Sequence, residues 1–449
     1  MKTIGEFLIE NKNHGYVSFR MPGHKGRSDI FTKAGFGDFY QQMIREDTSY
    51  APERTVKEVA DNYANLYQVK HTELLINGST AGIIAAVLTC VPRGGKLILG
   101  RSSHDSVFSA MRLGDIQPVY MKTYDEVRLA CEENLNASAI LVTSPTKYGE
   151  IQDIVRIADI AHNYGMKLIV DQAHGAHLKF FDAVTGTRMA AEDLGADIVI
   201  NSTHKNLLSF GGTGIMNVCS DRIDIEALAD NLKMVQTSSP SSLMLGSLDI
   251  NESIIRKWGG DMVVSWMKDL RFTYQTLEAI RGVKVFSSDR FDQTKISISM
   301  AELGVSGEQL KAELESKGIM PLGAYGEYVL LLTGAGNTRA DYQILLKTVR
   351  NITNNYAVGA RKIKPILQVP DFMLESEKLP MKKELVPLYK ADGRVLYNPI
   401  ITYPPGHPIA CPGEVLDMEV ITYLARAVEL GESISGIDDE GQIYVGAEE

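Results

Sequence analysis

The sequence predicts an α/β fold with a mostly parallel central sheet in a large domain, followed by a smaller C-terminal α+β domain. Between residues 72 and 220, short apolar runs of strand type alternate with segments of helical period. Such alternation is typical of crossover connections, which leave a parallel sheet covered by helices on both faces. After about residue 270 the regular alternation ends, which indicates a second domain.

The large domain is expected to cover residues 51–270, after an N-terminal arm, residues 1–50, that is rich in glycine and aromatic residues. The apolar runs predict strands over residues 72–77, 96–101, 137–144, 167–172, 196–202 and 211–218. A helix is predicted over residues 150–165, because the apolar period is helical and a glycine ends it.

The C-terminal α+β region is expected to cover residues 271–449. Its apolar runs predict strands over 294–300 and 327–334 and a helix over 340–356. A proline-rich segment, residues 397–414, is interpreted as an ordered loop.

Composition restricts the class of protein. The formal net charge of −10 argues against nucleic acid or anionic membrane as partners, since both attract concentrated Lys and Arg. Cys90, Cys131, Cys219 and Cys411 are far apart, so neither a disulfide framework nor a zinc ribbon is expected. The longest apolar run, residues 82–91, is about half the length that spans a bilayer. The N-terminus reaches charged residues too early for a secretory signal, so a soluble, cytoplasmic protein is expected.

Small hydroxyl residues follow the first predicted strand, at the start of a helix. Ser79 and Thr80 offer O–H groups beside free backbone N–H groups, which suits a phosphate. Plain N-capping by Ser or Thr is the alternative. Neither G-x-x-x-x-G-K-[ST] nor G-x-G-x-x-G occurs at this place, so a nucleotide site lacks its usual signals.

Three further polar residues follow predicted strands: His104, Asp171 and Lys205. A lone histidine such as His104 is more often a structural hydrogen-bonding group than a catalyst. Asp171 is either a cap for the next turn or a buried carboxylate, which is costly without a cationic partner. Because ligands gather at the carboxyl ends of parallel strands, we expect the three side chains to share one site.

A metal site is a competing interpretation of "DQAHGAH". Asp171, His174 and His177 follow each other at three-residue spacing, which could hold a metal on a helix. Gly175 and the strand before Asp171 argue against a helix there, and no Cys or Glu cluster supplies a further ligand. No metal is therefore expected.

A phosphate-binding loop, a flat ring, an aspartate and a lysine on successive strand ends match a pyridoxal 5′-phosphate (PLP) site. The helix N-terminus anchors the phosphate, the aspartate keeps the pyridine nitrogen protonated, and the lysine forms the Schiff base. Asp171 precedes Lys205 by 34 positions, which leaves room for one helix and the next strand. Each signal is weak alone, but their order is informative.

Several motifs together carry a family resemblance: "MPGHKG" (21–26), "NGSTAG" (77–82), "TSPTKYG" (143–149), "DQAHGAH" (171–177), "STHKN" (202–206) and "YPPGHPIACPGE" (403–414). In this combination the sequence resembles the PLP-dependent ornithine/lysine/arginine decarboxylases, which have the aspartate-aminotransferase-like fold, fold type I. The resemblance covers most of the chain. With 449 residues, the chain is similar to the short forms without an N-terminal wing domain.

The resemblance implies a role for each matching residue. Lys205 corresponds to the Schiff-base lysine, and Asp171 to the partner of the pyridinium nitrogen. His104 and Ala173 would lie against the two ring faces, with His174 near the phenolic oxygen. The implied cofactor-binding residues are Ser79, Thr80, His104, Thr146, Asp171, Ala173, His174, Ser202, His204, Lys205 and Ser238.

The resemblance also bears on partners and substrate. Residues 237–241, with Ser238, resemble a segment that reaches the phosphate of the neighbouring subunit, which implies a homodimer or a dimer-based oligomer. Glu414 resembles an acidic position near the distal end of the substrate, and a solvated carboxylate is the alternative. Lys147 stands where the family pattern has an aromatic residue, and residues 46–56 lack the usual histidines. These departures leave the choice of amino acid open.

The expected reaction is decarboxylation of lysine, arginine or ornithine to the corresponding amine and CO₂, as in polyamine biosynthesis. An aminotransferase is one alternative, in which Arg361, Arg394 or Arg426 would hold the substrate carboxylate. A non-catalytic relative is another, against which the intact Lys205 argues. Lys25, in "MPGHKG", is interpreted as a surface lysine on a turn.

Overall fold

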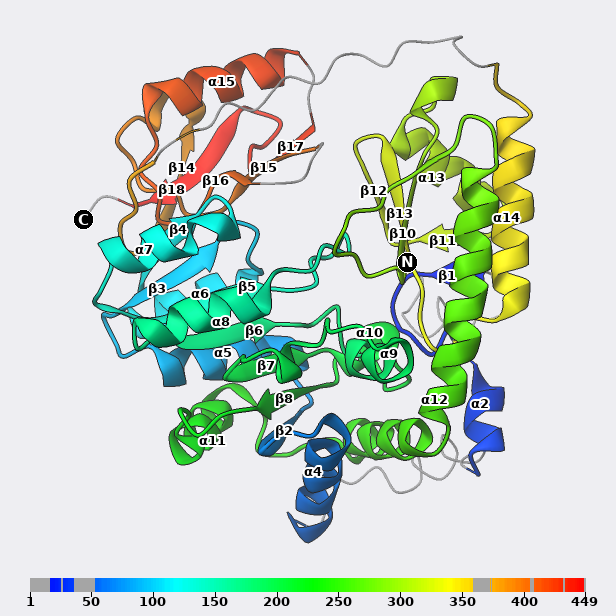
Figure 1. The fold of residues 1–449 in the computed structure, drawn as a ribbon. Helices are drawn as coiled ribbons and strands as arrows, with labels where there is room; N and C mark the ends of the chain where they lie inside the picture. The colour runs from blue at the N-terminus through cyan, green and yellow to red at the C-terminus, as the bar shows by residue number, and fades with distance from the viewer. Residues whose placement is uncertain are drawn as a thin grey trace.

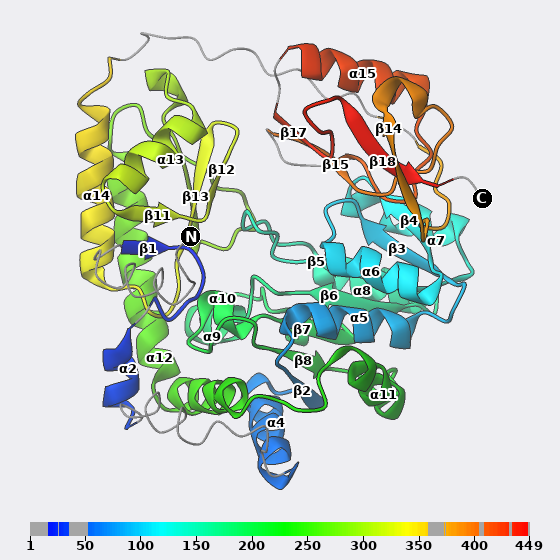
Figure 2. The same ribbon diagram turned by 180° about the vertical axis from the view of Figure 1, so that it is seen from behind.

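The computed structural model describes residues 17–25, 27–35, 53–357, 372, 374–403, 408–430 and 433–447. Figure 1 shows a central sheet with helices on both faces, the C-terminal segment in orange and red over one end, and a second, smaller sheet beside a long helix at the other end. Figure 2 shows from behind that the described N-terminal segment, in blue, begins with a strand near the second sheet and continues to a helix beside the long helix.

The central sheet has the strand order β2-β8-β7-β6-β5-β3-β4. These strands are β2 (His71–Leu75), β3 (Lys96–Gly100), β4 (Gln117–Met121), β5 (Ala137–Thr143), β6 (Lys167–Asp171), β7 (Ile198–Asn201) and β8 (Gly214–Val218). Neighbours from β4 to β7 pair in parallel, whereas β8 is antiparallel to β2 and β7. The expected mostly parallel sheet is confirmed. The sequence prediction missed β4, an edge strand that tolerates Pro118 because one side of it is unpaired.

Strand residues alternate between two hydrophobic cores, one on each face of the sheet. On β6, Ile169 packs in the first core while Leu168 and Val170 pack in the second. The first core is closed by α5 (Gly78–Cys90), α6 (Asp105–Gly114) and α11 (Ile225–Val235), and the second by α7 (Val127–Glu133) and α8 (Ile154–Asn163). Because α5 is apolar on nearly all sides, it is buried along most of its length.

The small domain is built on the antiparallel sheet β12-β13-β10-β9. Its elements are β9 (Lys284–Val285), β10 (Lys295–Ser299), α13 (Gly307–Ser316), β12 (Gly323–Tyr325), β13 (Tyr328–Leu332) and α14 (Arg339–Thr353). The long helix α12 (Ser242–Glu278) leads into it, and the boundary predicted at residue 270 falls inside this helix. At the N-terminus, β1 (Val17–Phe19) pairs in parallel with β11 (Ile319–Pro321), so this strand of the arm packs on the small domain.

The C-terminal segment has a hydrophobic core of its own. Its elements are β14 (Lys383–Pro387), β15 (Ile400–Tyr403), β16 (Pro408–Ala410), α15 (Met418–Glu429), β17 (Ser433–Ser435) and β18 (Gln442–Gly446). The region predicted as one α+β unit after residue 271 thus contains two cores. The remaining helices are α2 (Ser28–Lys33), α4 (Glu53–Tyr67), α9 (Leu178–Thr185) and α10 (Thr203–Asn206). Within the described ranges, no helix is both long and apolar enough to cross a membrane.

Candidate active site

A cavity of about 240 Å³ lies at the carboxyl ends of β3, β5 and β6. Three parts of the chain form its walls: the strand ends, the loop after β5, and the C-terminal segment. The lining residues are Ser79, Arg101, Ser102, Ser103, His104, Asp105, Phe108, Thr143, Thr146, Lys147, Tyr148, Glu150, Asp171, Ala173, His174, Lys205, Pro399, Ile401 and Pro408. The structure therefore brings Lys205, Asp171 and His104 into one cavity, as the strand-end argument predicts.

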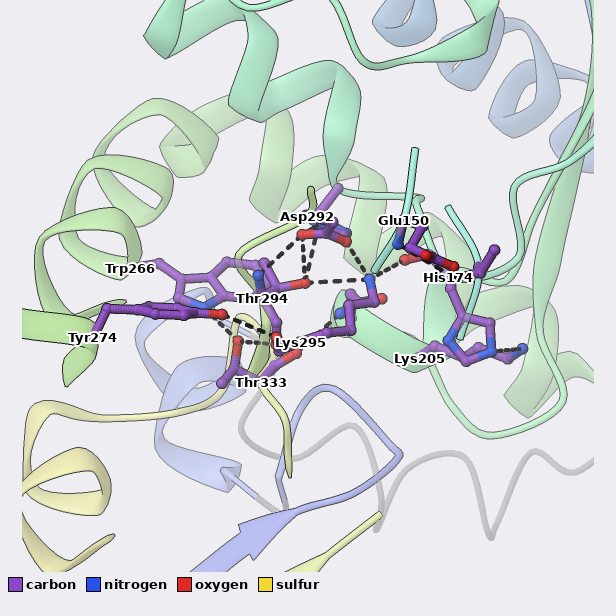
Figure 3. Close-up of polar contacts among 12 residues, drawn as sticks. Glu150, His174, Lys205, Trp266, Tyr274, Asp292, Thr294, Lys295 and Thr333 are labelled. Atoms are coloured by element: carbon purple, nitrogen blue, oxygen red, sulfur yellow. Dashed lines mark hydrogen bonds and ion pairs between the residues drawn. The ribbon is translucent and has the colours of Figure 1, made fainter. Parts of the chain in front are cut away.

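Lys205 lies on α10, the short helix that follows β7. Figure 3 shows its side chain next to that of His174. The Nζ of Lys205 lies 3.0 Å from Nε2 of His174. Burial lowers the pKa of Lys205, Asp171 opposes this effect, and the charge of Lys295 adds to it. Burial, Lys205 and Lys295 together hold the pKa of His174 well below its usual range, so the imidazole is neutral near pH 7. A neutral imidazole thus contacts an amine that gives up its proton more readily than a solvated lysine.

Asp171 ends β6 and is 4% exposed. One of its carboxylate oxygens accepts a hydrogen bond of 3.0 Å from the backbone N–H of Ala173. Among the residues that the structure describes, no Lys, Arg or His is within ion-pair distance of it. A buried carboxylate without a cation is costly, so this position suits a ligand that brings a positive charge into the cavity.

His104 combines the two roles that the sequence left open. It is the N-cap of α6, where its Nδ1 accepts from the backbone N–H of Ser106 at 3.2 Å. Its ring also lines the cavity, as does the buried Ala173. The helix cap fixes the ring orientation, because the imidazole cannot rotate without losing this bond.

The first turn of α5 points to a bound anion rather than to a side-chain cap. The helix begins at Gly78, and the N-cap residue Asn77 makes no side-chain cap bond. Ser79 and Thr80 lie inside the first turn, so the N-capping alternative is wrong for both. Ser79 lines the cavity, whereas Thr80 is exposed and lies outside the cavity lining. An uncapped helix start beside a cavity offers free N–H groups to a phosphate.

The other cofactor-binding residues predicted from the sequence divide into two groups. Thr146 lines the cavity. Ser202, His204 and Ser238 lie outside the cavity lining. Ser202 is fully buried and its hydroxyl has no partner among the described residues, while His204 Nδ1 lies 2.7 Å from the carbonyl oxygen of Thr213. Ser238 is exposed on this chain, so its predicted contact with a neighbouring subunit stays a prediction.

Glu414 is buried, with 1% of its surface exposed, so the solvated-carboxylate alternative is wrong. Its two carboxylate oxygens accept hydrogen bonds from the guanidinium of Arg101, one of them at 2.8 Å, and the Cys411 N–H donates to it at 2.6 Å. Arg101 lines the cavity and Glu414 does not. The pair joins the end of β3 to the C-terminal segment, and a direct contact between Glu414 and substrate stays a prediction.

Lys147, which departs from the family pattern, lines the cavity between two aromatic rings. Its Nζ lies 4.9 Å from the ring centre of Tyr148 and 4.7 Å from that of Tyr325 on β12. Burial lowers the pKa of this lysine. The aromatic surface expected at position 147 is thus present nearby, with the lysine packed against it.

Arg394 and Arg426, the two described arginines of the aminotransferase alternative, are not among the residues that line the cavity. Arg394 bonds to Glu384 and to the carbonyl of Gly446 at 2.6 Å, and Arg426 is exposed on α15. Arg361 and most of residues 46–56 lie outside the described residues. Neither described arginine is placed to hold a substrate carboxylate in this cavity.

The three side chains of the metal interpretation point to different partners. His174 meets Lys205, His177 Nε2 lies 3.1 Å from Asp292, and Asp171 bonds to Ala173. In the described ranges, no three His, Cys, Asp or Glu side chains form a group able to hold a metal. Their spacing therefore serves other contacts.

The interpretation of Lys25 as a solvated surface lysine is wrong. The turn is present, but Nζ of Lys25 points inward and donates to the carbonyls of Arg20 at 2.6 Å and Leu332 at 3.0 Å. Burial lowers the pKa of this amine to about 7.

Sequence reasoning missed two charged residues at the site, Arg101 and Lys295. Arg101 directly follows β3, and Asp171 is the last residue of β6. The expectation that ligand-binding side chains gather at strand ends therefore applied to Arg101 as well. Lys295 begins β10 in another domain, yet its ammonium group donates to the carbonyl of His174. A lysine at the start of an apolar strand gives no local sign of such a distant partner.

Two models of protein families match this chain. The model of "Orn/Lys/Arg decarboxylase, major domain" matches residues 4–298, and that of the "C-terminal domain" matches residues 375–445. An arginine decarboxylase of Bacillus anthracis is 26% identical over 96% of this chain and 94% of its own length.

Solved structures show the same fold. Lysine decarboxylase A from Pseudomonas aeruginosa has a TM-score of 0.73 at 17% identity, covering 98% of this chain and 79% of that chain. A structure of SPT with PLP has a TM-score of 0.61 at 14% identity, covering 76% of this chain and 88% of that chain. The predicted α/β architecture with a separate C-terminal part is confirmed.

Proposed function

Because the chain belongs to the Orn/Lys/Arg decarboxylase family, we propose that it decarboxylates lysine, arginine or ornithine with PLP attached to Lys205. The proposal is carried by one juxtaposition: the buried amine of Lys205 and the buried carboxylate of Asp171, which has no cationic partner among the described residues, line the same cavity. Relatives named arginine decarboxylase and lysine decarboxylase support the substrate class.

The polar groups that line the cavity fit those of the cofactor. Asp171 lacks a cation, and the hydroxyl of Thr143 and Nδ1 of His174 are buried without a hydrogen-bond partner among the described residues. The first turn of α5, which has no side-chain cap, adds backbone N–H groups beside Ser79. A pyridinium nitrogen, a phenolic oxygen and a phosphate are groups of the kind that these positions need. When bound, PLP supplies an electron sink for the bond that breaks.

Each residue then has a physical task. Asp171 holds a proton on the ring nitrogen, which keeps the ring electron-deficient. His104 and Ala173 would hold the ring between them, and Ser79 would help to bind the phosphate. Lys205, with its lowered pKa, is available as a neutral nucleophile and afterwards returns a proton to the α-carbon, a task for which His104 is the second candidate. Preorganised charges in a cavity shielded from water carry most of the rate gain.

The replacement Lys205→Ala tests the proposal. We expect loss of CO₂ release and of the borohydride-fixed PLP adduct that mass spectrometry would find on Lys205 in the wild type. Lys179→Ala is the matched control, because Lys179 pairs with Asp193 outside the cavity and its loss leaves the site intact. CO₂ release by the Lys205→Ala protein at the wild-type rate would contradict the assignment.

Product analysis with lysine, arginine and ornithine identifies the substrate. Formation of a 2-oxo acid without CO₂ would favour the aminotransferase alternative instead. The predicted homodimer or dimer-based oligomer is tested by light scattering, which should give twice the chain mass of 49.5 kDa or a multiple of that dimer mass.

A further inference from the structure

A second lysine, Lys295, is fully buried next to the cavity. An ammonium group has three donors and no acceptor, and burial without partners would be very costly. All three donors are used: one meets the carboxylate of Asp292, one the hydroxyl of Thr294 at 3.2 Å, and one the carbonyl of His174 at 2.5 Å. Figure 3 shows Lys295 between Asp292 and His174.

Asp292 is itself held in place by several donors. Its carboxylate accepts from the N–H of Thr294 at 3.0 Å and from the Thr294 hydroxyl at 2.8 Å, and faces Nε2 of His177 at 3.1 Å. Burial alone would raise the pKa of Asp292, but His177 and Lys295 hold it far below its usual range. The N–H of Asp292 donates to the carbonyl of Gly149 at 2.8 Å, so the unit is fixed to the cavity loop.

His174 connects this unit to the amine that reacts. Its carbonyl accepts from Lys295, while its imidazole Nε2 lies 3.0 Å from Nζ of Lys205. One residue therefore separates the two lysines in the chain of contacts. A shift of Lys295 would move the backbone of His174 and, with it, the imidazole that meets Lys205.

We propose that Lys295 is a positioning residue, which holds the imidazole of His174 against the amine of Lys205 and places a fixed positive charge behind it. This inference rests on the proposed role of Lys205. The charges are consistent with this role. Asp292 neutralises Lys295 within the buried unit, but the positive charge of Lys295 still lowers the pKa of Lys205.

The charge of Lys295 should have a measurable effect on the pKa of Lys205. The pKa of Lys205 is lowered by burial, raised by Asp171 and lowered again by Lys295. A nearby cation makes an amine easier to deprotonate, and the deprotonated amine is the nucleophile. The titratable groups that face Lys205 from the surrounding elements are His174 and Asp171 after β6, Lys295 on β10, and His104, Lys147 and Glu150 across the cavity.

A purely structural role is the alternative, in which the Lys295–Asp292 pair only fastens the small domain to the large one. In that case its removal lowers stability but leaves the protonation of Lys205 unchanged. The two roles therefore predict different pKa values for Lys205, which Lys295 does not contact.

The double replacement Lys295→Met, Asp292→Asn removes both charges while keeping the side-chain volumes. It avoids an unpaired buried carboxylate, which would threaten folding. Lys179→Met is the matched control, because it also removes a lysine–aspartate pair with a buried lysine but has no bond to His174. Should the double variant not fold, Lys295→Gln takes its place, since it removes the charge and keeps a donor.

Competitive acetylation of the full-length protein, after any PLP has been removed, over a pH series and read by mass spectrometry on Lys205, measures the pKa of its free amine. We expect the pKa of Lys205 to rise in the double variant and to stay at the wild-type value in Lys179→Met. The acidic limb of kcat/KM should move to higher pH in the same variant, with kcat at pH 7 about 100-fold lower.

An unchanged acetylation curve for Lys205 in the folded double variant would overturn the inference. Failure of the proposed function is seen separately, as the absence of a borohydride-fixed PLP adduct on Lys205 of the wild type. The acetylation result does not depend on that adduct.

Discussion

Gly23, in "MPGHKG", packs directly against the helix that carries Lys205. Its N–H donates to the carbonyl of His204 at 2.7 Å, and its carbonyl accepts from Gly336 at 2.9 Å. A Cβ at position 23 would lie 2.3 Å from the carbonyl oxygen of Leu207 and 2.5 Å from the carbonyl carbon of Asn206. Both are backbone atoms, so α10 or the motif must move by about 1 Å to restore van der Waals contact.

The variant Gly23→Ala should therefore lose activity more than stability. A misplacement of about 1 Å at reacting groups can lower the rate by about 100-fold, whereas overpacking costs about 1–3 kcal/mol of unfolding free energy. Steady-state CO₂ release gives kcat, and urea unfolding gives the free energy. Gly260→Ala is the control, because nothing lies within 4 Å of a Cβ there and alanine favours the helix.

Wild-type turnover by a folded Gly23→Ala protein would refute this reasoning. It would mean that α10 absorbs the clash without moving the amine of Lys205. Loss of both activity and fold would leave Gly336→Ala as the second probe, since a Cβ at position 336 would lie 2.4 Å from the carbonyl carbon of His24 in the same motif.

Asp171→Asn should lower kcat by about 100- to 1000-fold with a smaller change in KM, because the amide cannot stabilise a positive ring nitrogen; an equal loss through KM alone would contradict that role. Glu414→Gln leaves the Arg101 guanidinium without its anion at a position where Glu414 is 1% exposed, and should cost about 3 kcal/mol in urea unfolding. Unchanged stability would show that the pair contributes nothing. Because burial lowers the pKa of Lys25 to about 7, the unfolded chain binds more protons than the folded one above that pH. Stability should therefore rise as the pH increases from about 7 towards 10, and Lys25→Met should remove this part of the slope.

The central sheet and its polar strand ends could be predicted because the information is local. An apolar run followed by one polar residue defines both a buried strand and a side chain at its end, as with β6 and Asp171. The parallel arrangement then brings these ends together without knowledge of strand order. Strand β4 was missed because Pro118 weakens its strand pattern, and only its edge position makes the residue acceptable.

Contacts between distant segments could not be predicted from the sequence in this way. Arg101 and Glu414 each have the pattern of a solvated charge, and their pairing depends on how the C-terminal segment packs over β3. The same holds for Lys295, whose partner His174 lies in another domain. Such pairs are specified by the packing of whole domains, which no window of neighbouring residues contains.

The cavity takes one wall, Pro399, Ile401 and Pro408, from the C-terminal segment, while the reacting amine and its carboxylate come from the central sheet. Replacements on the C-terminal wall can therefore reshape the cavity without changing the residues at the strand ends. Under the proposed function, we expect differences in substrate preference among proteins built on this plan to be found in that wall.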